Sequence, residues 1–435
     1  MPSPRIPSDG RLEGTWALLR DPYRFISGTC QRLGSDIFTT RLLLSPTICM
    51  TGADGADFFY SSKSLTRAQA APLRIRRTLL GDGGVQGLDE ADHRHRKAMF
   101  LSLMETHRVR RLGELVCQQW LEAARGWRGT IDLYSELQRI LMRAVCAWSG
   151  IPLRPEDVTS RTHDLAALFD AAGAIGPRHW LARRARLRSE TWAMGLIADA
   201  RAHRLRPAEE SALRVIADHR DRRGRMLDLP VAGVELLNVI RPTVAMAVFM
   251  VQSAHALAVN PDVHERLRQR PEEYAPLIGQ EVRRFYPFFP AAIARTKEAV
   301  TWRSYELPAG HRVLLDLHGI NHDPRKWSDP GLFLPERFRG SYDAAAFVPQ
   351  GGGAHADNHR CPGEWIAVEL LRITALLLSG PLSYRVPPQP LEIPMRRIPA
   401  LPARFTIDEV RVNDDHPAMP RWTTTRRINR ATVLR

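Results

Sequence analysis

The stretch "FVPQGGGAHADNHRCPGEWIAVELLRITALLL", Phe347 to Leu378, carries the most specific pattern in the chain. Three consecutive glycines lead to Cys361, and Pro362 and an apolar-periodic segment of helical length follow it. Because proline suits the first position of a helix, we expect the Cys361 sulfur at a helix N-terminus, where free N–H groups and the helix dipole favour a thiolate. The glycines would let a large flat group approach the backbone closely. Such a thiolate is suited to ligate haem iron, and an inert buried cysteine is the alternative.

The composition of the 435 residues is that of a globular protein, with 44% hydrophobic and 25% charged residues. The N-terminal "MPSPRIPSDGRLEGTW" lacks the apolar core of a signal peptide. We expect no membrane span, because no apolar run approaches the roughly 18 residues that a span needs. The cysteines form no CxxC pair, so neither a disulfide framework nor a zinc site is supported, and a cytoplasmic location is predicted. The five cysteines are Cys30, Cys49, Cys117, Cys146 and Cys361.

A net charge of +15 raises the question of a nucleic-acid partner. The arginines are spread along the chain, as in "LARRARLR" and "DHRDRRGRM", without interleaved stacking aromatics or a known nucleic-acid module. We therefore expect no nucleic-acid binding. The charge is better explained by a solvated surface, a site for an anionic cofactor and a docking face for acidic proteins.

The periodicity predicts a mainly α-helical chain with small β-sheets. Residues 35–52 should form two strands around Ser45 and Pro46, and residues 299–324 a second small sheet with a turn at Pro308 to Gly310. No repeat or linker divides the chain, so we expect one domain over residues 1–413 and a basic, mobile tail over 414–435. The predicted helices cover residues 91–104, 105–128, 131–149, 189–205, 229–259 and 276–286.

The segment "ELLNVIRPTVAMAVFM", Glu235 to Met250, places a charge and a helix breaker inside an apolar run. Burying an unpaired guanidinium costs several kcal/mol or more, and a proline inside a helix costs roughly 3 kcal/mol. If the substrate is a carboxylic acid, Arg241 could hold its carboxylate through a charge-assisted pair. The alternative is that Arg241 pairs with Glu235 or reaches the surface. No acid lies near the helix centre, and Thr243 is the only hydroxyl close by.

Two further segments extend the pattern over most of the chain. "QEVRRFYPF" carries Glu281 and Arg284 on one helix face, and "LFLPERFRG" carries Arg337 ahead of the cysteine loop. In this order, from "DPYRFI" to about residue 410, the chain resembles the cytochrome P450 superfamily. The resemblance implies the cytochrome P450 fold, with heme b between the long central helix and the cysteine loop and Cys361 as its axial thiolate ligand. Glu281, Arg284 and Arg337 would form a structural network behind the haem.

Within the superfamily the chain resembles the bacterial fatty-acid peroxygenases, which also share its long interval from Phe347 to Cys361. One departure is Asn358, where a glycine is usual before His-Arg-Cys. Asparagine tolerates a left-handed backbone, so we expect the loop to keep its shape. The segments that carry this resemblance are "GGVQGLDEADHRHRK", "ELLNVIRPTVA", "QEVRRFYPFFP", "GINHDPRKW", "PQGGG" and "HRCPGEW".

This resemblance implies hydroxylation of long-chain fatty acids at the α or β carbon with hydrogen peroxide, without an obligatory reductase. Arg241 would hold the substrate carboxylate, which serves as the general acid-base that the helix lacks. Pro242 would break the helix to make room. Gln86 near the substrate resembles hydroxylating rather than decarboxylating members, and Leu80 resembles α-selective ones.

Further positions carry over from the same resemblance. His93, Lys97 and Arg360 would contact the haem propionates. Phe288 and Phe289 would form the wall of an acyl channel, with ordinary core packing as the alternative. Two other functions remain open: a conventional monooxygenase that uses oxygen with separate ferredoxin and reductase partners, and a non-catalytic haem or fatty-acid-binding sensor.

Overall fold

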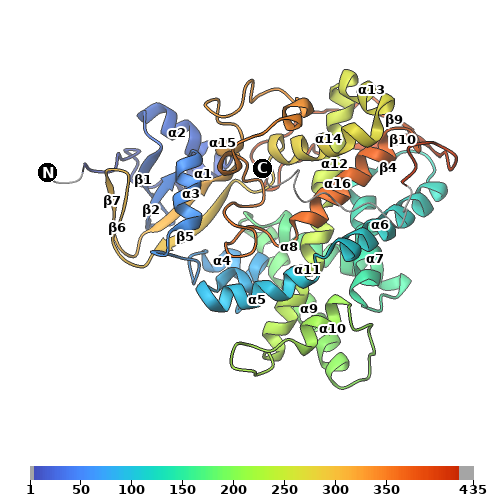
Figure 1. Ribbon diagram of the computed structural model, residues 1–435, viewed down its shortest axis with the longest axis horizontal. Helices are drawn as coiled ribbons and strands as arrows, with labels where there is room; N and C mark the ends of the chain where they lie inside the picture. Colours follow the sequence, from blue (N-terminus) through green and yellow to red (C-terminus); the bar gives the residue numbers. More distant parts are fainter. Residues whose placement is uncertain (1–3, 421–435) are drawn as a thin grey trace.

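The computed structural model describes residues 4–420. Figure 1 shows a strand-rich part at the N-terminal side and a larger helical part around the long central helix. The predicted mainly helical fold with small sheets is therefore confirmed. The helices are α1 (Thr15–Arg20), α2 (Phe25–Leu33), α3 (Ala53–Ser61), α4 (Leu73–Ile75), α5 (Glu90–Ser102), α6 (Thr106–Gly126), α7 (Leu133–Ser149), α8 (Val158–Asp170), α9 (Pro177–Arg201), α10 (Ala212–Asp218), α11 (Leu229–Ala245), α12 (Ala247–Val259), α13 (Pro261–Gln269), α14 (Pro271–Phe285), α15 (Leu317–Asn321) and α16 (Glu364–Leu378).

Short irregular helices and ten strands complete the described chain. The irregular helices are the π-helical turn η1 (Arg76–Leu80) and the 3-10 turns η2 (Val85–Gly87), η3 (Pro155–Asp157), η4 (Pro335–Arg339) and η5 (Ala344–Ala346). The strands are β1 (Ile37–Leu42), β2 (Ser45–Met50), β3 (Leu65–Thr66), β4 (Ile131–Asp132), β5 (Ala291–Thr296), β6 (Val300–Trp302), β7 (Tyr305–Leu307), β8 (Arg312–Asp316), β9 (Leu382–Arg385) and β10 (Thr406–Val412).

The main sheet joins both strand regions that the sequence predicts. Its order is β1-β2-β8-β5-β3, with β2 and β8 parallel and the other pairs antiparallel. The two strands predicted in residues 35–52 are present, but their turn lies at Leu43 and Leu44, and Ser45 and Pro46 begin β2. The second predicted sheet is wrong in part. Only β6 and β7 pair separately, and β8 joins the main sheet, because strand pairing joins segments far apart in the sequence.

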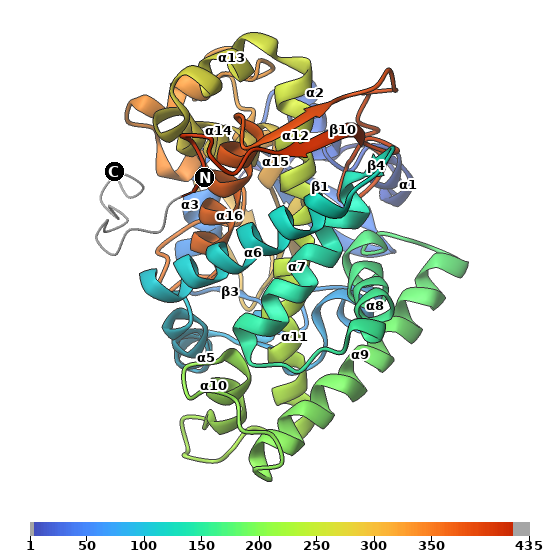
Figure 2. The same cartoon turned by 90° about the vertical axis from the view of Figure 1, so that its right-hand side faces the viewer.

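The central helix is divided into α11 and α12 at Met246 rather than being one continuous element. Helix α11 packs against α7 and α9, and α12 packs against α14 and α16, so the core surrounds it (Figure 2). The segment Leu229–Val259 is long and apolar enough to cross a membrane, with mean hydropathy 1.6, and 94% of that window is buried inside the protein. The expectation that no apolar run reaches the length of a span was therefore wrong, since a core helix has the same composition.

Helix boundaries differ from expectation mainly at prolines. Helix α9 begins at Pro177, well before the predicted start at Ser189, and α14 begins at Pro271 and contains Pro276. A proline in the first turn of a helix is compatible with the helix, because the N–H that it lacks has no partner there. The other predicted helices lie within a few residues of α5, α6 and α7.

The packed chain continues beyond the predicted domain boundary at residue 413. Ala418 is buried, and Arg125 on α6 forms an ion pair with Asp414. The predicted tail therefore does not begin at Asp414, because these residues cover α6. Its remainder, residues 421–435, lies outside the described residues.

Candidate active site

The cysteine loop places Cys361 just before α16. The helix begins at Glu364 with Gly363 as its N-cap, so Pro362 lies in the preceding turn and not at the first helical position. The Cys361 N–H donates to the Gln350 carbonyl at 3.0 Å. Cys361 is partly exposed, whereas the other four cysteines are buried. Cys361 is thus the one cysteine that is not buried, and its loop is fixed at both sides.

Burial raises the pKa of the Cys361 thiol, although the Gly363 N–H and the positive charge of Lys97 act in the opposite direction. The helix terminus alone therefore does not produce the thiolate that the sequence predicts. A bound metal cation would do so, because a coordinating thiol is deprotonated by the metal.

The glycine loop keeps its shape through Gly351 and Gly353, whose φ angles are +89° and +77°. The left-handed conformation that we expected for Asn358 is wrong, because its φ angle is not positive. Its side chain supports the loop instead. Its side-chain oxygen accepts from the Ala354 N–H at 2.7 Å, and its amide donates to the Tyr60 carbonyl at 2.7 Å. Asn358 therefore ties the loop together and anchors it to α3.

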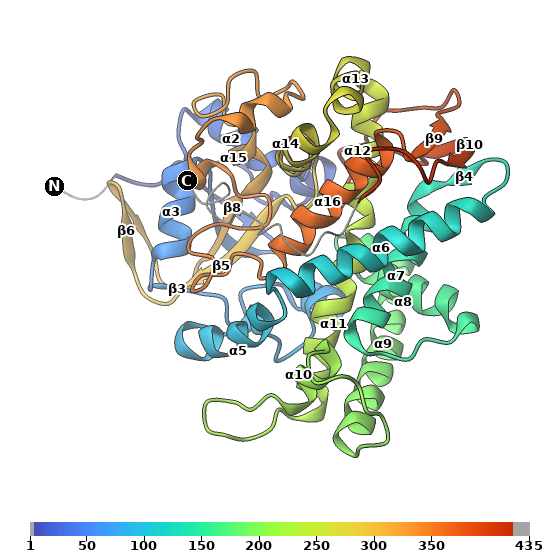
Figure 3. The ribbon, with the colours of Figure 1, turned by 45° about the vertical axis from the view of Figure 1, so that its right-hand side comes forward.

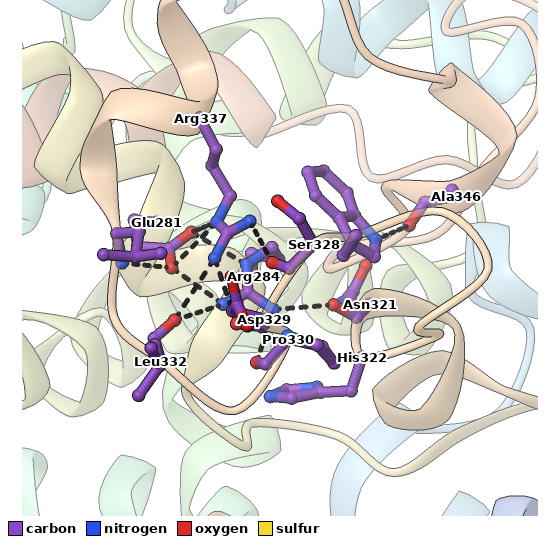
Figure 4. Close-up of polar contacts among 12 residues, drawn as sticks. Glu281, Arg284, Asn321, His322, Ser328, Asp329, Pro330, Leu332, Arg337 and Ala346 are labelled. Carbon is purple, nitrogen blue, oxygen red and sulfur yellow. Dashed lines mark hydrogen bonds and ion pairs between the residues drawn. The ribbon is translucent and has the colours of Figure 1, made fainter.

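Behind the loop, Glu281 and Arg284 on α14 form a buried bidentate ion pair, with both distances 2.7 Å (Figure 4). Arg337 joins Glu281 at 3.3 Å. Arg284 also donates to the Asn321 carbonyl at 2.9 Å, and the Asn321 side chain accepts from the Val348 N–H at 2.9 Å. The network of Glu281, Arg284 and Arg337 thus holds the chain that leads into the cysteine loop.

A second ion-pair group lies at the start of α16. Glu364 is buried between two arginines, with Nε of Arg360 at 2.6 Å from its carboxylate and the guanidinium of Arg283 on the other side. Arg283 also donates to the side-chain oxygen of Gln350 at 3.0 Å. Burial alone would raise the pKa of Glu364, but the two guanidinium groups lower it to about 2. The side chain of Arg360 is thus committed to Glu364, and only its carbonyl faces Lys97. The contact of Arg360 with a propionate stays a prediction, and it would be made beside the ion pair in which Nε and Nη2 of Arg360 bind Glu364.

Four basic side chains gather beside the loop, and we call them the basic cluster: Arg67, His93, Lys97 and His359. Lys97 donates to the Arg360 carbonyl at 2.7 Å and to the carbonyl of Asn358. The rings of His93 and His359 stack with centroids 3.9 Å apart. Arg67 donates to the Ile293 carbonyl at 2.6 Å and influences the pKa of both histidines.

Two members of the basic cluster, Arg67 and Lys97, form no ion pair with a carboxylate in residues 4–420. Burial lowers the pKa of His93 to about 4 and that of Lys97 to about 8, and charge repulsion within the cluster lowers the His93 value further. The neighbouring Asp89 already accepts from Thr66 and from the Arg67 N–H. An anionic group with two carboxylates would restore the balance. His359 and Arg67 were not predicted; the position of His359 beside Cys361 was a signal, but Arg67 carried none.

On the central helix, Arg241 is buried, with 7% of its surface exposed. Its Nη2 donates to the Asn238 side-chain oxygen at 3.2 Å, and its Nε has no partner among the described residues. Glu235 pairs instead with Arg96 at 2.7 Å. The alternative in which Arg241 pairs with Glu235 or reaches the surface is therefore wrong. No carboxylate in residues 4–420 forms an ion pair with Arg241.

Asn238, one helical turn before Arg241, connects the polar groups around it. Its amide donates to Glu235 at 2.8 Å and to the side-chain oxygen of Gln86 at 3.2 Å. Gln86 lies on η2, so one side chain fixes both Gln86 and Arg241. Asn238 was missed because its role depends on a contact between residues 152 positions apart.

Pro242 lies inside α11, and the helix continues through it as far as Ala245. The predicted break at Pro242 is thus absent, and the helices divide only at Met246. Pro242 is exposed although its neighbours Arg241 and Thr243 are buried. Burial lowers the pKa of Arg241 to about 9, with repulsion from Arg186 adding to the effect and the Cys361 thiolate opposing it. Arg241 and Cys361 therefore interact electrostatically from opposite elements.

The predicted pocket wall is half-buried. Leu80 ends η1, which Arg186 on α9 holds through the Leu79 carbonyl at 3.2 Å. The Phe288 ring stacks on Phe249 of α12 with centroids 4.8 Å apart, and Phe289 packs edge-on against it. The aromatic wall is thus continuous with the core.

Comparison with known proteins agrees with this geometry. A sequence model of the family "Cytochrome P450" matches residues 273–391. Cytochrome P450 4A10 of Mus musculus is 30% identical over 161 residues, 32% of this chain and 30% of that protein. The match thus spans under a third of such curated relatives.

Solved structures match over almost their whole length. Cytochrome P450SP alpha in complex with (R)-ibuprophen is 48% identical, covering 92% of this chain and 99% of that one with a TM-score of 0.90. Cytochrome P450EX alpha with myristic acid is 39% identical, covering 94% and 100% with a TM-score of 0.91. A variant of cytochrome P450 OleT in complex with arachidonic acid is 31% identical, covering 95% and 100% with a TM-score of 0.90.

These matches confirm the predicted cytochrome P450 fold and imply haem iron as the cofactor. The chain belongs to the bacterial fatty-acid peroxygenase family of the cytochrome P450 superfamily.

Proposed function

We propose that the protein is a haem-thiolate peroxygenase that hydroxylates long-chain fatty acids at the α or β carbon with hydrogen peroxide. The observation that carries this proposal is Arg241, a buried guanidinium with one weak amide partner and an unpartnered Nε. Two of the similar structures contain a fatty acid. A carboxylate on Arg241 would offset the free energy of burying its charge.

The residues around Cys361 fit heme b. Its sulfur would be the axial ligand, and the basic cluster of Arg67, His93, Lys97 and His359 would hold the two propionates. Pro242 on α11 is exposed and Cys361 in the loop is partly exposed, as positions that face a bound flat group would be. When bound, thiolate-ligated haem supplies the oxidising power that cleavage of the peroxide O–O bond releases.

The ion pairs around Arg241 favour a substrate with one carboxylate. Arg96 is paired with Glu235 at 2.7 Å, and Arg186 with Glu190 at 2.7 Å. Of Arg96, Arg186 and Arg241, only Arg241 has no carboxylate partner among residues 4–420. One fatty-acid carboxylate would complete the set, with Asn238 orienting the guanidinium that receives it.

The substrate carboxylate would also supply the proton transfer. The Thr243 hydroxyl donates to the Val239 carbonyl at 2.9 Å and is occupied within the helix. Glu235 is occupied by Arg96 and Asn238. Neither group is placed to move a proton at the open side of the helix, so the carboxylate on Arg241 would accept and return the peroxide proton as general acid-base.

Positioning would set the outcome of the reaction. A carboxylate fixed on Arg241 leaves only its nearest carbons within reach of the oxidant. Gln86, held by Asn238 at 3.2 Å, would keep the pocket polar beside the carboxylate and favour hydroxylation over decarboxylation. Leu80 would pack against the first carbons of the chain, and Phe288 and Phe289 against later ones. A cytoplasmic location and independence from a reductase are part of the same proposal.

The test uses the purified haem-loaded protein with myristate and hydrogen peroxide, without a reductase. Hydroxymyristate with the hydroxyl on the α or β carbon, identified by mass spectrometry, is the expected product. Product that forms only with a ferredoxin, reductase and NADPH would replace the proposal with a conventional monooxygenase. No product in either regime, together with tight myristate binding, would support a non-catalytic binding protein.

A further inference from the structure

The start of helix α9 exposes large apolar side chains. Ile175 is 52% exposed, and Trp180, Leu181 and Leu187 are each 60% exposed. Trp180 and Leu187 lie two helical turns apart, so they share the outer face of the helix. Single exposed apolar residues are ordinary, but a group of this size on one face needs an occupant.

Arginines alternate with these apolar residues along the same helix. Arg178, Arg184 and Arg188 are exposed, and the Arg183 guanidinium lies 5.7 Å from the centre of the Trp180 ring. The inner face of the helix is buried against α8 and α11. The outer face of this part of α9 thus carries tryptophan, leucine and arginine together, whereas its inner face is buried.

A second exposed apolar group lies around α1 and the turn between β1 and β2. Leu12 is 93% exposed, Trp16 72%, Leu43 49% and Leu44 74%. Leu43 and Leu44 both have positive φ angles, 51° and 59°, which non-glycine residues rarely adopt. The Glu13 carboxylate accepts the N–H groups of both leucines, at 3.2 and 2.9 Å. The turn is therefore held in a strained form that presents two leucines outward.

The two groups lie toward the same side of the molecule. In Figure 2, α1 and the N-terminal end of α9 both project to the right, away from the cysteine loop and α16. Figure 3, turned by 45°, shows α9 beside α8 and α10 in the helical part. We use the name lipid face for this surface, made of Leu12, Trp16, Leu43, Leu44, Ile175, Trp180, Leu181 and Leu187.

We propose that the lipid face docks the protein onto an anionic lipid bilayer. Tryptophan and leucine interleaved with arginine are the side chains that lie in the interface of a membrane, where the rings and aliphatic groups enter the headgroup region and the guanidinium groups meet lipid phosphates. The net charge of +15 adds long-range attraction to such a surface. The protein would lie on the bilayer without crossing it.

The position of the lipid face suits delivery of substrate. Arg74 on α4 donates to the Ala174 carbonyl at 3.0 Å in the loop before α9, and Arg186 on α9 holds η1. The lipid face is thus continuous with the segment that ends at Leu80. Fatty acids partition into bilayers, so docking would raise their local concentration at the pocket entrance. This delivery role rests on the proposed function, whereas bilayer binding does not.

Vesicle sedimentation tests the proposal directly. The haem-loaded protein is mixed with vesicles of phosphatidylcholine alone or with phosphatidylglycerol, at low and high salt. The protein should sediment with the anionic vesicles, and less so at high salt. The triple variant Trp180→Ser, Leu181→Ser, Leu187→Ser should bind the anionic vesicles at least about tenfold more weakly than the parent. Leu332→Ser, which removes a leucine that is 57% exposed outside the lipid face, is the matched control and should bind like the parent.

Other outcomes overturn the proposal. Parent protein that stays in the supernatant with anionic vesicles, or a triple variant that binds as well as the parent, refutes bilayer docking. A concentration-dependent dimer in sedimentation velocity that the triple variant lacks, without vesicle binding, would assign the face to a second copy of the chain. Turnover of dissolved myristate in detergent is measured separately, so a protein that binds vesicles without turnover refutes only the proposed function.

Discussion

The buried pair of Glu235 and Arg96 offers a quantitative test of how the pocket is held. Glu235 is fully buried and accepts from Arg96 at 2.7 Å and from Asn238 at 2.8 Å. Removing one partner of a buried pair leaves an uncompensated charge and costs about 3–5 kcal/mol. We expect Arg96→Met and Glu235→Met each to lower the free energy of unfolding by that amount.

The double variant should be more stable than the sum of the single effects predicts. Apolar residues of similar volume in place of a buried pair are often nearly neutral, so the coupling free energy should be about 2 kcal/mol or more. Burial raises the pKa of Glu235, and Arg96 counteracts this. In Arg96→Met the folded pKa should rise further, so the destabilisation should be larger at pH 7 than at low pH, where the carboxyl is protonated in both states.

Urea unfolding of the haem-loaded variants, followed by circular dichroism, measures these quantities. The KM for myristate gives an independent readout, because Glu235→Met removes the acceptor that orients Asn238 and thereby Arg241. Additive single effects, or equal destabilisation of Arg96→Met at low and neutral pH, would refute the account of a coupled pair. Stability loss without any change in KM would show that the pair does not position Arg241.

Three further predictions concern the proposed chemistry. Arg241→Ala should lower kcat/KM for myristate by about a hundredfold or more while the haem spectrum stays unchanged, and full activity would refute the carboxylate contact. Because the cationic form binds the carboxylate and the pKa of Arg241 is lowered to about 9, KM should be constant from neutral pH to about 8, be roughly doubled at pH 9 and rise further above it; a flat profile to pH 10 would contradict this. Cys361→Ala should lose the long-wavelength ferrous–CO band of thiolate ligation, and its retention would show that another residue is the ligand.

The parts of the site that could be predicted are those with local patterns. The cysteine loop, the partners of Glu281 and the buried position of Arg241 each follow from spacing within one segment or from the motif order. The pairing of β8 with β2 could not be predicted, because neighbouring strands in the sheet are distant in the sequence.

The same reason explains the missed polar contacts. Asn238 matters through Gln86, and His359 matters through the ring of His93 on α5. Arg360 was assigned to the propionates from its place beside Cys361, but Glu364 lies one helical turn ahead and takes its guanidinium. Position along the chain therefore indicated which loop carries the site, but not the partners of its side chains.

The break expected at Pro242 shows a further limit. A proline in a helix predicts a missing hydrogen bond, yet the surrounding core of α7, α8 and α9 keeps the helix continuous to Ala245. Tertiary packing therefore keeps this segment helical, and Pro242 is an exposed position between buried neighbours.

The central claim is that the substrate carboxylate on Arg241 supplies the acid-base group of the reaction. It is tested most directly by comparing myristic acid with its methyl ester as substrates of the haem-loaded protein and hydrogen peroxide, without a reductase. The two molecules share the same chain, and only the acid can form the ion pair and exchange a proton. The account predicts hydroxylation of the acid at the α or β carbon and no measurable hydroxylation of the ester. Hydroxylation of the ester at a comparable rate and position would contradict it.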